Sequence, residues 1–408
     1  MSRSGSLYLW SIPSQALTRE EPTLTRHSLT RISTIARFPV LLFVIAFALH
    51  PFSVGSRDLH GSVPVVRQVE PPEVSAAAVL VVDLTTGIQI YASNADAPLP
   101  PASTMKIVTA LVAKSILGLD EQLTVQEGDI LDPTVFSNMQ LQAGDVVGVE
   151  TLLHGVLIPS GADAAMVLAR EAGNRLEPGT VDPVGRFVAE MNVWVAAHGM
   201  TNTHFTNPVG TDDPQHFASA RDLIRASAVL LRDWLLARIV AMESFVAELG
   251  GPNARQVELV NSNQLISRDD VYGIKTGTEG IAGQCLITGF WRGDNQIITV
   301  VLGSADRYAD TQAVMDAVDG TYRWLALGIG AVSQGASDAL TAQGLTFMTR
   351  RTVLMTVAQA EQITWELVID SQPRGERRGA VIFELNGRVV ARMSIYSISS
   401  GAIVPDAA

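Results

Sequence analysis

The run PLPPASTMKIVTALVAKSIL, residues 98–117, marks where the first long helix of this 408-residue chain begins and which of its faces is buried. Three prolines between positions 98 and 101 stop any regular element. After them, apolar side chains at 107, 108, 111, 112 and 116 repeat with the period of a helix that packs one face into a core. Ser103 and Lys106 therefore lie at the start of a core helix, one turn apart on the same face.

Runs rich in β-forming residues lie on both sides of this helix in the sequence. They are 76–84 and 88–92, joined by a Thr85-Thr86-Gly87 turn, and then about 270–278, 284–291 and 296–303. The last two, QCLITGFW and QIITVVLG, are largely apolar, which is typical of strands covered by helices on both faces. We therefore predict an α/β (α+β) domain over residues 76–328, with one antiparallel sheet built from two distant pieces of chain.

Helical periodicity dominates between about 120 and 265. The predicted helices are 149–157, 163–173, 183–199 and 219–240, and a further one covers 310–327. We expect the first four to form an all-helical subdomain beside the sheet. Residues 328–345 are small and polar, as in a linker. Residues 346–400 hold short β-rich runs with a hairpin signal at Asn386-Gly387, which predicts a small all-β domain.

The first 50 residues differ from the rest of the chain. Five arginines and two glutamates in residues 1–37 precede the apolar run FPVLLFVIAFALHPF, residues 38–52. Cations followed by about a dozen apolar residues are typical of an export signal, and a bilayer span needs about 20. We expect residues 1–50 to be an export signal or an N-terminal membrane anchor, with a buried core helix as the alternative. Residues 51–75 are predicted to be a linker, and the rest of the chain to lie outside the cytoplasm.

The composition excludes several classes of function. A formal net charge of −12 argues against nucleic acid, because phosphate binding needs clustered Lys and Arg, which the chain lacks. The single cysteine, Cys285, excludes an internal disulfide and any CxxC site. The seven histidines form no HExxH or similar ligand spacing. We expect no metal and no cofactor.

Three short motifs carry the candidate chemistry, and each has a plainer alternative. The first motif, Ser103-Thr104-Met105-Lys106, places a hydroxyl beside an amine, and a desolvated lysine can take the hydroxyl proton. The alternative is a serine that caps the helix and a lysine that is solvated. Pro159-Ser160-Gly161-Ala162-Asp163 is a second active-site motif or an N-cap serine. Lys275-Thr276-Gly277-Thr278 can bind a carboxylate and an oxyanion, or is an ordinary strand end.

Taken together, the order and spacing of these motifs resemble those of the penicillin-recognising serine enzymes. The surrounding stretches resemble low-molecular-mass penicillin-binding proteins of the D-alanyl-D-alanine carboxypeptidase family; they are LPPASTMKIVTAL, FSNMQLQAGDVVGVETLLHGVLIPSGADAA, GMTNTHFTNPVGTDDPQHFASARDL and GIKTGTEGIAGQCL. The resemblance covers roughly residues 75–330 and implies a β-lactamase/transpeptidase-like fold. The segment RGAVIFELNGRVVARMSI resembles, more loosely, the β-domain that follows the catalytic domain in many members.

The resemblance implies a role for each motif residue. Ser103 would form the acyl-enzyme, Lys106 would accept its proton, and Ser160 would relay protons toward a leaving D-alanine. The substrate-binding residues would be Lys275, Thr276, Gly277, Thr278 and Arg221. Of these, Lys275 and Thr276 would hold the terminal carboxylate with support from Arg221, and the N–H groups of Ser103 and Thr278 would form the oxyanion hole. The implied partners are peptidoglycan stem peptides, with β-lactam antibiotics as covalent inhibitors.

Two departures from the family pattern matter. The family usually has Asn third in the second motif, where this chain has Ala162. That loss removes a polar contact worth about 1–3 kcal/mol if buried partners are left unpaired. Many members also end in an amphipathic membrane helix, whereas this chain ends SGAIVPDAA. Any membrane attachment would therefore depend on residues 38–52.

Four functions stay open on the sequence. The first is a carboxypeptidase that trims D-alanine from stem peptides. A β-lactamase would need a deacylating Glu; Glu171 and Glu177 follow the second motif, but not in the ExxxN setting of such enzymes. Ala162 makes a penicillin-binding module with little turnover credible. A generic Ser-His-Asp esterase has the least support, because no GxSxG elbow is present.

Overall fold

The computed structural model describes residues 69–328, 334–373 and 375–398. The predictions for residues 1–50, for the apolar run 38–52 and for most of the first linker lie outside the described residues. The C-terminal residues 399–408 lie outside them as well. In the part of the chain that is described, no helix is both long enough and apolar enough to cross a bilayer.

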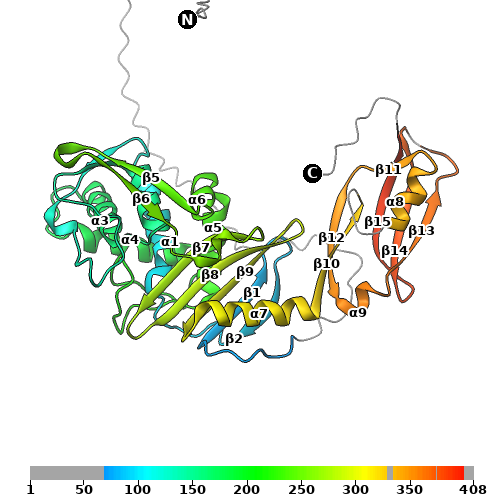
Figure 1. Ribbon diagram of the computed structural model, residues 1–408, viewed down its shortest axis with the longest axis horizontal. Helices are drawn as coiled ribbons and strands as arrows, with labels where there is room; N and C mark the ends of the chain where they lie inside the picture. Colours follow the sequence, from blue (N-terminus) through cyan, green and yellow to red (C-terminus); the bar gives the residue numbers. More distant parts are fainter. Residues whose placement is uncertain (1–68, 329–333, 374, 399–408) are drawn as a thin grey trace, which may run out of the picture. The chain divides into compact units, whose positions relative to one another are not determined.

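A five-stranded antiparallel sheet in the order β2-β1-β9-β8-β7 forms the centre of the larger domain (Figure 1). Its strands are β1 (Ala78–Asp83), β2 (Ile88–Ser93), β7 (Val271–Glu279), β8 (Gly283–Arg292) and β9 (Asn295–Ser304). The two pieces of chain join where β1 pairs with β9, from Ala78 opposite Leu302 to Asp83 opposite Ile297. The predicted antiparallel sheet of distant segments is confirmed.

Both faces of this sheet are buried, because side chains along each strand alternate between two cores. On one face, Val79 and Val81 belong to the same cluster as Val314 and Val318 of α7 (Arg307–Thr321). On the other face, Leu80 belongs to the large cluster of the helical subdomain. Figure 1 shows α7 lying along the sheet. The prediction that the apolar runs 284–291 and 296–303 are strands covered on both faces is confirmed.

Six α-helices fill the chain between β2 and β7. They are α1 (Lys106–Ile116), α2 (Val149–Leu157), α3 (Ala162–Leu176), α4 (Pro183–Ala197), α5 (Ala220–Arg232) and α6 (Trp234–Val240). A 3₁₀ turn, η1 (Ala102–Met105), leads into α1. The single helix predicted over 219–240 is wrong, because Asp233 interrupts it: its carboxylate accepts the N–H groups of Leu235 and Leu236 and caps a new helix.

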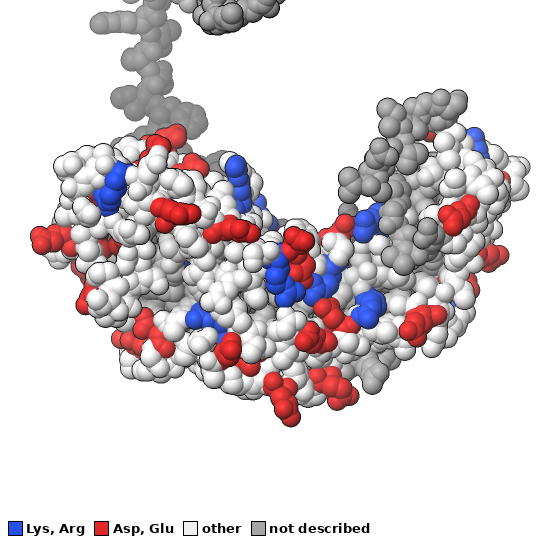
Figure 2. Space-filling view, in the orientation of Figure 1, with Lys and Arg blue, Asp and Glu red and all other residues white. Residues whose placement is uncertain are grey.

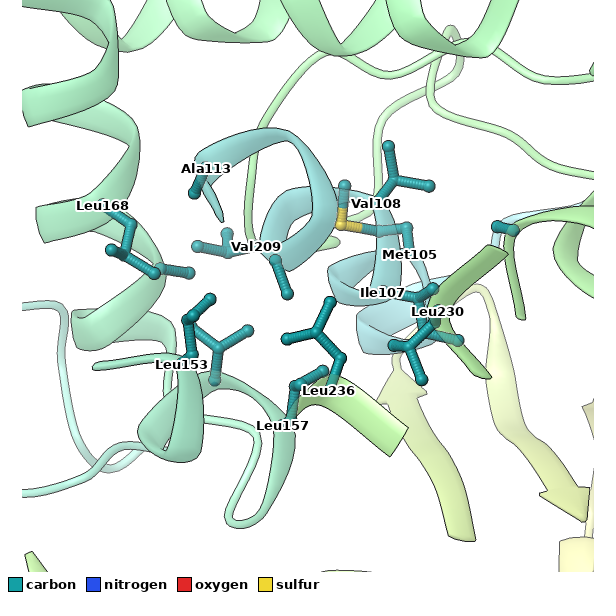
Figure 3. Packing of buried hydrophobic residues seen from close by; sticks show 14 of the residues in the cluster. Met105, Ile107, Val108, Ala113, Leu153, Leu157, Leu168, Val209, Leu230 and Leu236 are labelled. Carbon is teal, nitrogen blue, oxygen red and sulfur yellow. The ribbon is translucent and has the colours of Figure 1, made fainter. Parts of the chain in front are cut away.

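Helix α1 runs through the centre of the larger core. Figure 3 shows Met105, Ile107 and Val108 among side chains of the neighbouring helices, including Leu153, Leu157, Leu168, Leu230 and Leu236. Each fully buried side chain of this size stabilises the fold by about 1.5–3 kcal/mol relative to exposure. The dense packing holds the start of α1, where the first motif lies, in one fixed place.

Short strands and turns accompany the helices, and the sequence analysis did not predict them. They are β3 (Gln122–Thr124), β4 (Val146–Gly148), β5 (Ser244–Leu249), β6 (Arg255–Val260), η2 (Glu127–Asp129), η3 (Gly251–Asn253) and η4 (Gln264–Ser267). β3 pairs with β4, and β5 with β6. Along β6, Val257 and Leu259 are buried while Val260 is exposed, which is the period-two signal of a half-buried strand.

The C-terminal part has its own sheet and core. A four-stranded antiparallel sheet runs in the order β11-β15-β14-β13, and β10 pairs separately with β12. The elements are β10 (Tyr322–Gly328), α8 (Gln334–Thr341), β11 (Leu345–Phe347), β12 (Arg350–Thr356), α9 (Val357–Ala360), β13 (Thr364–Ile369), β14 (Arg377–Leu385) and β15 (Arg388–Ser397). Asn386 and Gly387 both have positive φ, as the predicted hairpin turn requires.

Two boundary predictions are corrected here. The helix predicted over 310–327 ends at Thr321, because residues 322–328 pair with β12 as a strand. The linker predicted over 328–345 contains helix α8, whose apolar residues Ala336 and Leu340 are buried. In the first case the contact that decides the structure comes from β12, further along the chain.

Candidate active site

Ser103 and Lys106 are brought together at the junction of η1 and α1. The Lys106 Nζ donates a hydrogen bond to Ser103 Oγ over 2.8 Å and a second to the carbonyl oxygen of Ser160 over 2.9 Å. Ser103 Oγ in turn donates to the carbonyl oxygen of Val209 over 3.3 Å. The half-buried hydroxyl of Ser103 is thus held next to the buried amine of Lys106.

Burial makes Lys106 a base near neutral pH. Its side chain is 2% exposed, and this desolvation lowers the pKa of Lys106 from 10.5 to about 7, against the opposing effect of the carboxylates of Asp163 and Glu279. Removing an ammonium from water disfavours its charged form. A neutral amine 2.8 Å from a hydroxyl oxygen can accept the hydroxyl proton.

The second motif lies opposite Lys106. Ser160 is 3% exposed, its backbone is left-handed with φ of 70°, and its Oγ has no hydrogen-bond partner among the described residues. Non-glycine residues rarely take this conformation, and it clusters at functional sites. A buried hydroxyl without a partner is costly, so it is suited to a ligand that supplies one.

Ala162 begins helix α3 and leaves a methyl group where the family has an amide. The neighbouring Asp163 does not replace that amide. Its carboxylate accepts the backbone N–H groups of Met139 and Leu141, so its hydrogen bonds are to backbone in the preceding loop. Burial raises the pKa of Asp163, while these hydrogen bonds oppose the rise.

Strand β7 supplies the third motif. Lys275 is 1% exposed and donates to the carbonyl oxygen of Thr276 over 3.1 Å. Burial lowers the pKa of Lys275 well below its ordinary value, and the nearby charges of Lys106 and Arg307 act in the same direction. The hydroxyl of Thr276 shares a 2.6 Å hydrogen bond with that of Ser262.

Gly277 allows β7 to lie directly against the nucleophile's turn. A Cβ at this position would stand 3.0 Å from the backbone nitrogens of Ser103 and Thr104. Any side chain here would push the strand away from η1. The N–H groups of Ser103 and Thr278, the predicted oxyanion hole, therefore lie on two backbones that approach closely.

Two arginines differ in how they relate to the third motif: Arg221, which the sequence suggested, and Arg307, which it did not. Arg221 donates to both oxygens of Asp96, at 2.6 and 3.0 Å, and to Gln89 at 2.9 Å, so the bonds of its guanidinium are to residues outside the three motifs. Arg307, at the start of α7, donates to the carbonyl oxygen of Gly277 over 2.8 Å and to Thr278 Oγ1. Arg307 is not among the residues predicted from the sequence, because no local pattern marks an arginine that reaches β7 only in the fold.

Other chemistries find less support in the arrangement. Glu171 and Glu177 stand near the far end of α3, and at 1.5 Å per residue Glu171 is about 13 Å along the helix from Ala162. Glu171 accepts from Arg170 there. Among the residues that are described, no group of three His, Cys, Asp or Glu side chains could hold a metal ion. The face in Figure 2 shows acidic and basic side chains interspersed on a mostly uncharged surface.

The antiparallel sheet, its covering helices and the helical subdomain define a mixed α/β fold of the transpeptidase type. The model of the peptidase S11 family, described as D-alanyl-D-alanine carboxypeptidase, matches residues 65–306. The chain belongs to this family of serine peptidases, which confirms the resemblance noted in the sequence.

Individual relatives agree with this assignment. The chain is 29% identical to a D-alanyl-D-alanine carboxypeptidase of Streptomyces sp. (strain K15) over 61% of its own length and 88% of the relative's. It is 33% identical to D-alanyl-D-alanine carboxypeptidase DacC of Escherichia coli, over 58% of this chain and 59% of that protein. The latter match therefore spans less than two thirds of the relative.

Solved structures give the same picture. The crystal structure of the Streptomyces K15 DD-transpeptidase superposes with a TM-score of 0.58 at 28% identity, covering 62% of this chain and 99% of that one. Penicillin binding protein 6B from Escherichia coli gives a TM-score of 0.58 at 23% identity, with 82% of this chain and 99% of that one covered. At this identity the second match supports the fold alone, but it extends over the C-terminal sheet as well.

Proposed function

We propose that this chain is a serine D-alanyl-D-alanine carboxypeptidase that removes the terminal D-alanine from peptidoglycan stem peptides. The observation that carries the proposal is the 2.8 Å hydrogen bond between Lys106 Nζ and Ser103 Oγ, made by a lysine whose pKa burial lowers to about 7. A serine hydroxyl is a weak nucleophile until such a neighbour takes its proton.

In the acylation step, Ser103 Oγ attacks the carbonyl carbon of the penultimate D-alanine and its proton passes to Lys106 Nζ. The oxyanion that develops is stabilised by the N–H groups of Ser103 and Thr278. The C–N bond then breaks, and the proton returns to the leaving amine through Ser160, whose buried Oγ is without a partner in the described chain. D-alanine leaves and an ester on Ser103 remains.

In the deacylation step, a water molecule attacks this ester while Lys106 accepts one of its protons. The C–O bond to Ser103 breaks and Oγ recovers its proton from Lys106. The shortened peptide leaves with a new carboxylate, and the enzyme returns to its starting state. The same amine thus serves as base and acid in both steps.

The terminal carboxylate of the substrate is assigned to the end of β7. Lys275, Thr276 and Arg307 place an amine, a hydroxyl and a guanidinium around this strand, next to Gly277. A bound carboxylate would favour the charged form of Lys275 and so offset the cost of its burial. Arg221 is not part of this assignment, because its guanidinium is bonded to Asp96.

The site of action is proposed to be outside the cytoplasm. Support comes from the arginines and the apolar run of residues 1–52, which the sequence offers as an export signal or anchor. Fractionation of the full-length protein and of a form truncated before Pro51 separates these two. With a cleaved signal both forms appear in soluble fractions, whereas an anchor holds only the full-length chain in the membrane fraction.

A penicillin-binding module with little turnover is the second candidate, and Ala162 favours it. Without an amide at this position, one contact to the substrate's peptide group is missing. Such a protein would form the acyl-enzyme and release it slowly.

Mass spectrometry of the intact protein after exposure to benzylpenicillin tests the shared first step. We expect a covalent adduct on the wild type and none on Ser103→Ala. Release of D-alanine from diacetyl-Lys-D-Ala-D-Ala then separates the carboxypeptidase from the penicillin-binding module with little turnover. Rapid loss of the adduct, accompanied by penicillin hydrolysis, would instead indicate a β-lactamase. A wild-type protein that takes up no penicillin would refute the assignment of Ser103.

A further inference from the structure

The loop of residues 207–211 is organised by one side chain. Asn207 Oδ1 accepts the backbone N–H groups of Val209 at 3.2 Å, Gly210 at 2.7 Å and Thr211 at 3.1 Å. Asn207 Nδ2 donates to the carbonyl oxygen of Thr211 over 3.0 Å. Both polar atoms of the Asn207 amide therefore bond to the backbone of the loop. The loop is held together by this side chain and not by the hydrogen bonds of a helix or a sheet.

Three consecutive residues of this loop contact η1 or helix α1, which follows it. The carbonyl oxygen of Pro208 accepts from Thr109 Oγ1 of α1 over 2.8 Å, and that of Val209 accepts from Ser103 Oγ over 3.3 Å. Gly210, with φ of 91°, lies so close that a Cβ there would stand 2.3 Å from the carbonyl oxygen of Ala102. The loop fixes both the hydroxyl of Ser103 and the backbone that carries it.

We propose that Asn207 is the positioning residue of the nucleophile: its carboxamide shapes a loop whose Val209 carbonyl oxygen holds the Ser103 hydroxyl against Lys106. The inference rests on the proposed function of Ser103 as the nucleophile. With Oγ held between Val209 O and Lys106 Nζ, attack requires only that the O–H bond turn toward the amine. The side chain itself already stands in place, so little ordering is left for the moment of reaction.

Asn207 does not touch the substrate in this account, so its loss should slow acylation without weakening the encounter with penicillin. A displacement of about 1 Å at a reacting group can lower a rate by roughly 100-fold. For Asn207→Ala we expect the limiting acylation rate constant to fall at least about tenfold on this ground, with the penicillin dissociation constant unchanged within about threefold.

Asn207→Asp is the rescue variant. One carboxylate oxygen can accept the same three N–H groups with charge-assisted bonds. The bond that Nδ2 donates to the carbonyl oxygen of Thr211 is lost, so the rescue is expected to be partial. Because the variant adds a negative charge, it is compared with the wild type on the plateau of each pH profile. We expect the plateau rate of Asn207→Asp to exceed that of Asn207→Ala severalfold.

Asn192→Ala is the matched structural control. Asn192 is also a half-buried asparagine that bonds to backbone on both sides, accepting from Phe205 N over 2.9 Å and donating to Phe205 O over 2.7 Å. It supports the chain just before the loop without reaching residues 207–211. A purely structural effect would lower the melting temperature and the acylation rate similarly in both alanine variants.

The experiment measures intact-protein acylation by benzylpenicillin over a range of concentrations, which separates the rate constant from the dissociation constant. An unchanged rate constant in folded Asn207→Ala, or an equal fall in Asn192→Ala, would overturn the inference. If Asn207→Ala does not fold, Asn207→Ser is judged by the same criterion. The readout is acylation, so the role of Asn207 can be decided even if the protein never releases D-alanine. The absence of that release would refute only the proposed carboxypeptidase activity. A wild type that is not acylated would refute both.

Discussion

The two ends of helix α1 hold the same side chain in opposite surroundings. Lys106, at the N-terminal end, is 2% exposed and bonds to a hydroxyl and a carbonyl oxygen. Lys114, in the last turn, is 24% exposed at its side chain and forms a 2.6 Å ion pair with Asp233. The helix dipole disfavours a cation at the first place and favours one at the second. Position and burial, rather than residue type, make one lysine a base and the other an ion-pair partner.

The largest effect expected from this contrast is the loss of acylation in Lys106→Met. Methionine fills a similar buried volume but cannot accept a proton, and a general base contributes about 10²–10⁴-fold to a rate. We expect penicillin acylation to slow by about 10³-fold on this basis, measured by intact mass spectrometry. Lys114→Met is the control and should acylate like the wild type. A Lys106→Met protein that keeps a tenth of the activity would contradict the role of the buried amine.

The pH dependence of acylation sharpens the same contrast. The base must be unprotonated, and burial lowers the pKa of Lys106 to about 7, so the rate should fall tenfold per unit below that pH and level off above it. The carboxylate of Glu279 favours the ammonium form, so Glu279→Gln should lower the pKa of Lys106 and move the profile to lower pH.

The control for that profile is Glu243→Gln, which neutralises an exposed carboxylate that is not among the causes of the shift at Lys106. A profile centred near pH 10 in the wild type would show that Lys106 is solvated like an ordinary lysine. An equal shift in both glutamine variants would point to net charge rather than to Glu279.

A smaller effect is expected when the family's amide is restored beside Lys106. The family pattern implies that a carboxamide at this position bridges the amine and a substrate peptide group, so Ala162→Asn is expected to give a net gain of about 1 kcal/mol. That corresponds to roughly a fivefold rise in D-alanine release from diacetyl-Lys-D-Ala-D-Ala. The release is measured at saturating and at limiting peptide, which gives kcat and kcat/KM. A fall in both constants would mean that the pocket has adapted to the alanine methyl group.

The smallest effect belongs to Lys114. Its ion pair with Asp233 is partly exposed, with side chains at 24% and 25%, and such pairs contribute about 0.2–1 kcal/mol. Lys114→Met should therefore lower the free energy of unfolding in urea by no more than about 1 kcal/mol. A loss of several kcal/mol would show that Asp233 needs this partner to cap α6.

Sequence reasoning was strongest where the signal is local. The one-turn spacing of Ser103 and Lys106, the alternation of the strands and the Asn386-Gly387 turn are all written in neighbouring residues. It failed where distant contacts decide. Asp233 divides a continuous helical pattern into two helices, while the role predicted for Arg221 stays a prediction. Arg307 and Asn207 carry no local mark of their place beside the motifs, although Asn207 lies within a stretch that resembles the family.

The pairing of β1 with β9 has a consequence for the order in which the protein can form. Asp83 and Asn295 share a 2.7 Å hydrogen bond across 212 positions of sequence. At roughly 5–20 residues per second of synthesis, the first hairpin waits about ten to forty seconds for its partner strand. During that time both serine and lysine of the first motif exist, but a growing chain that ends before β7 lacks the strand that covers them. The active site in this fold is therefore completed late, when β7 and β9 join the sheet.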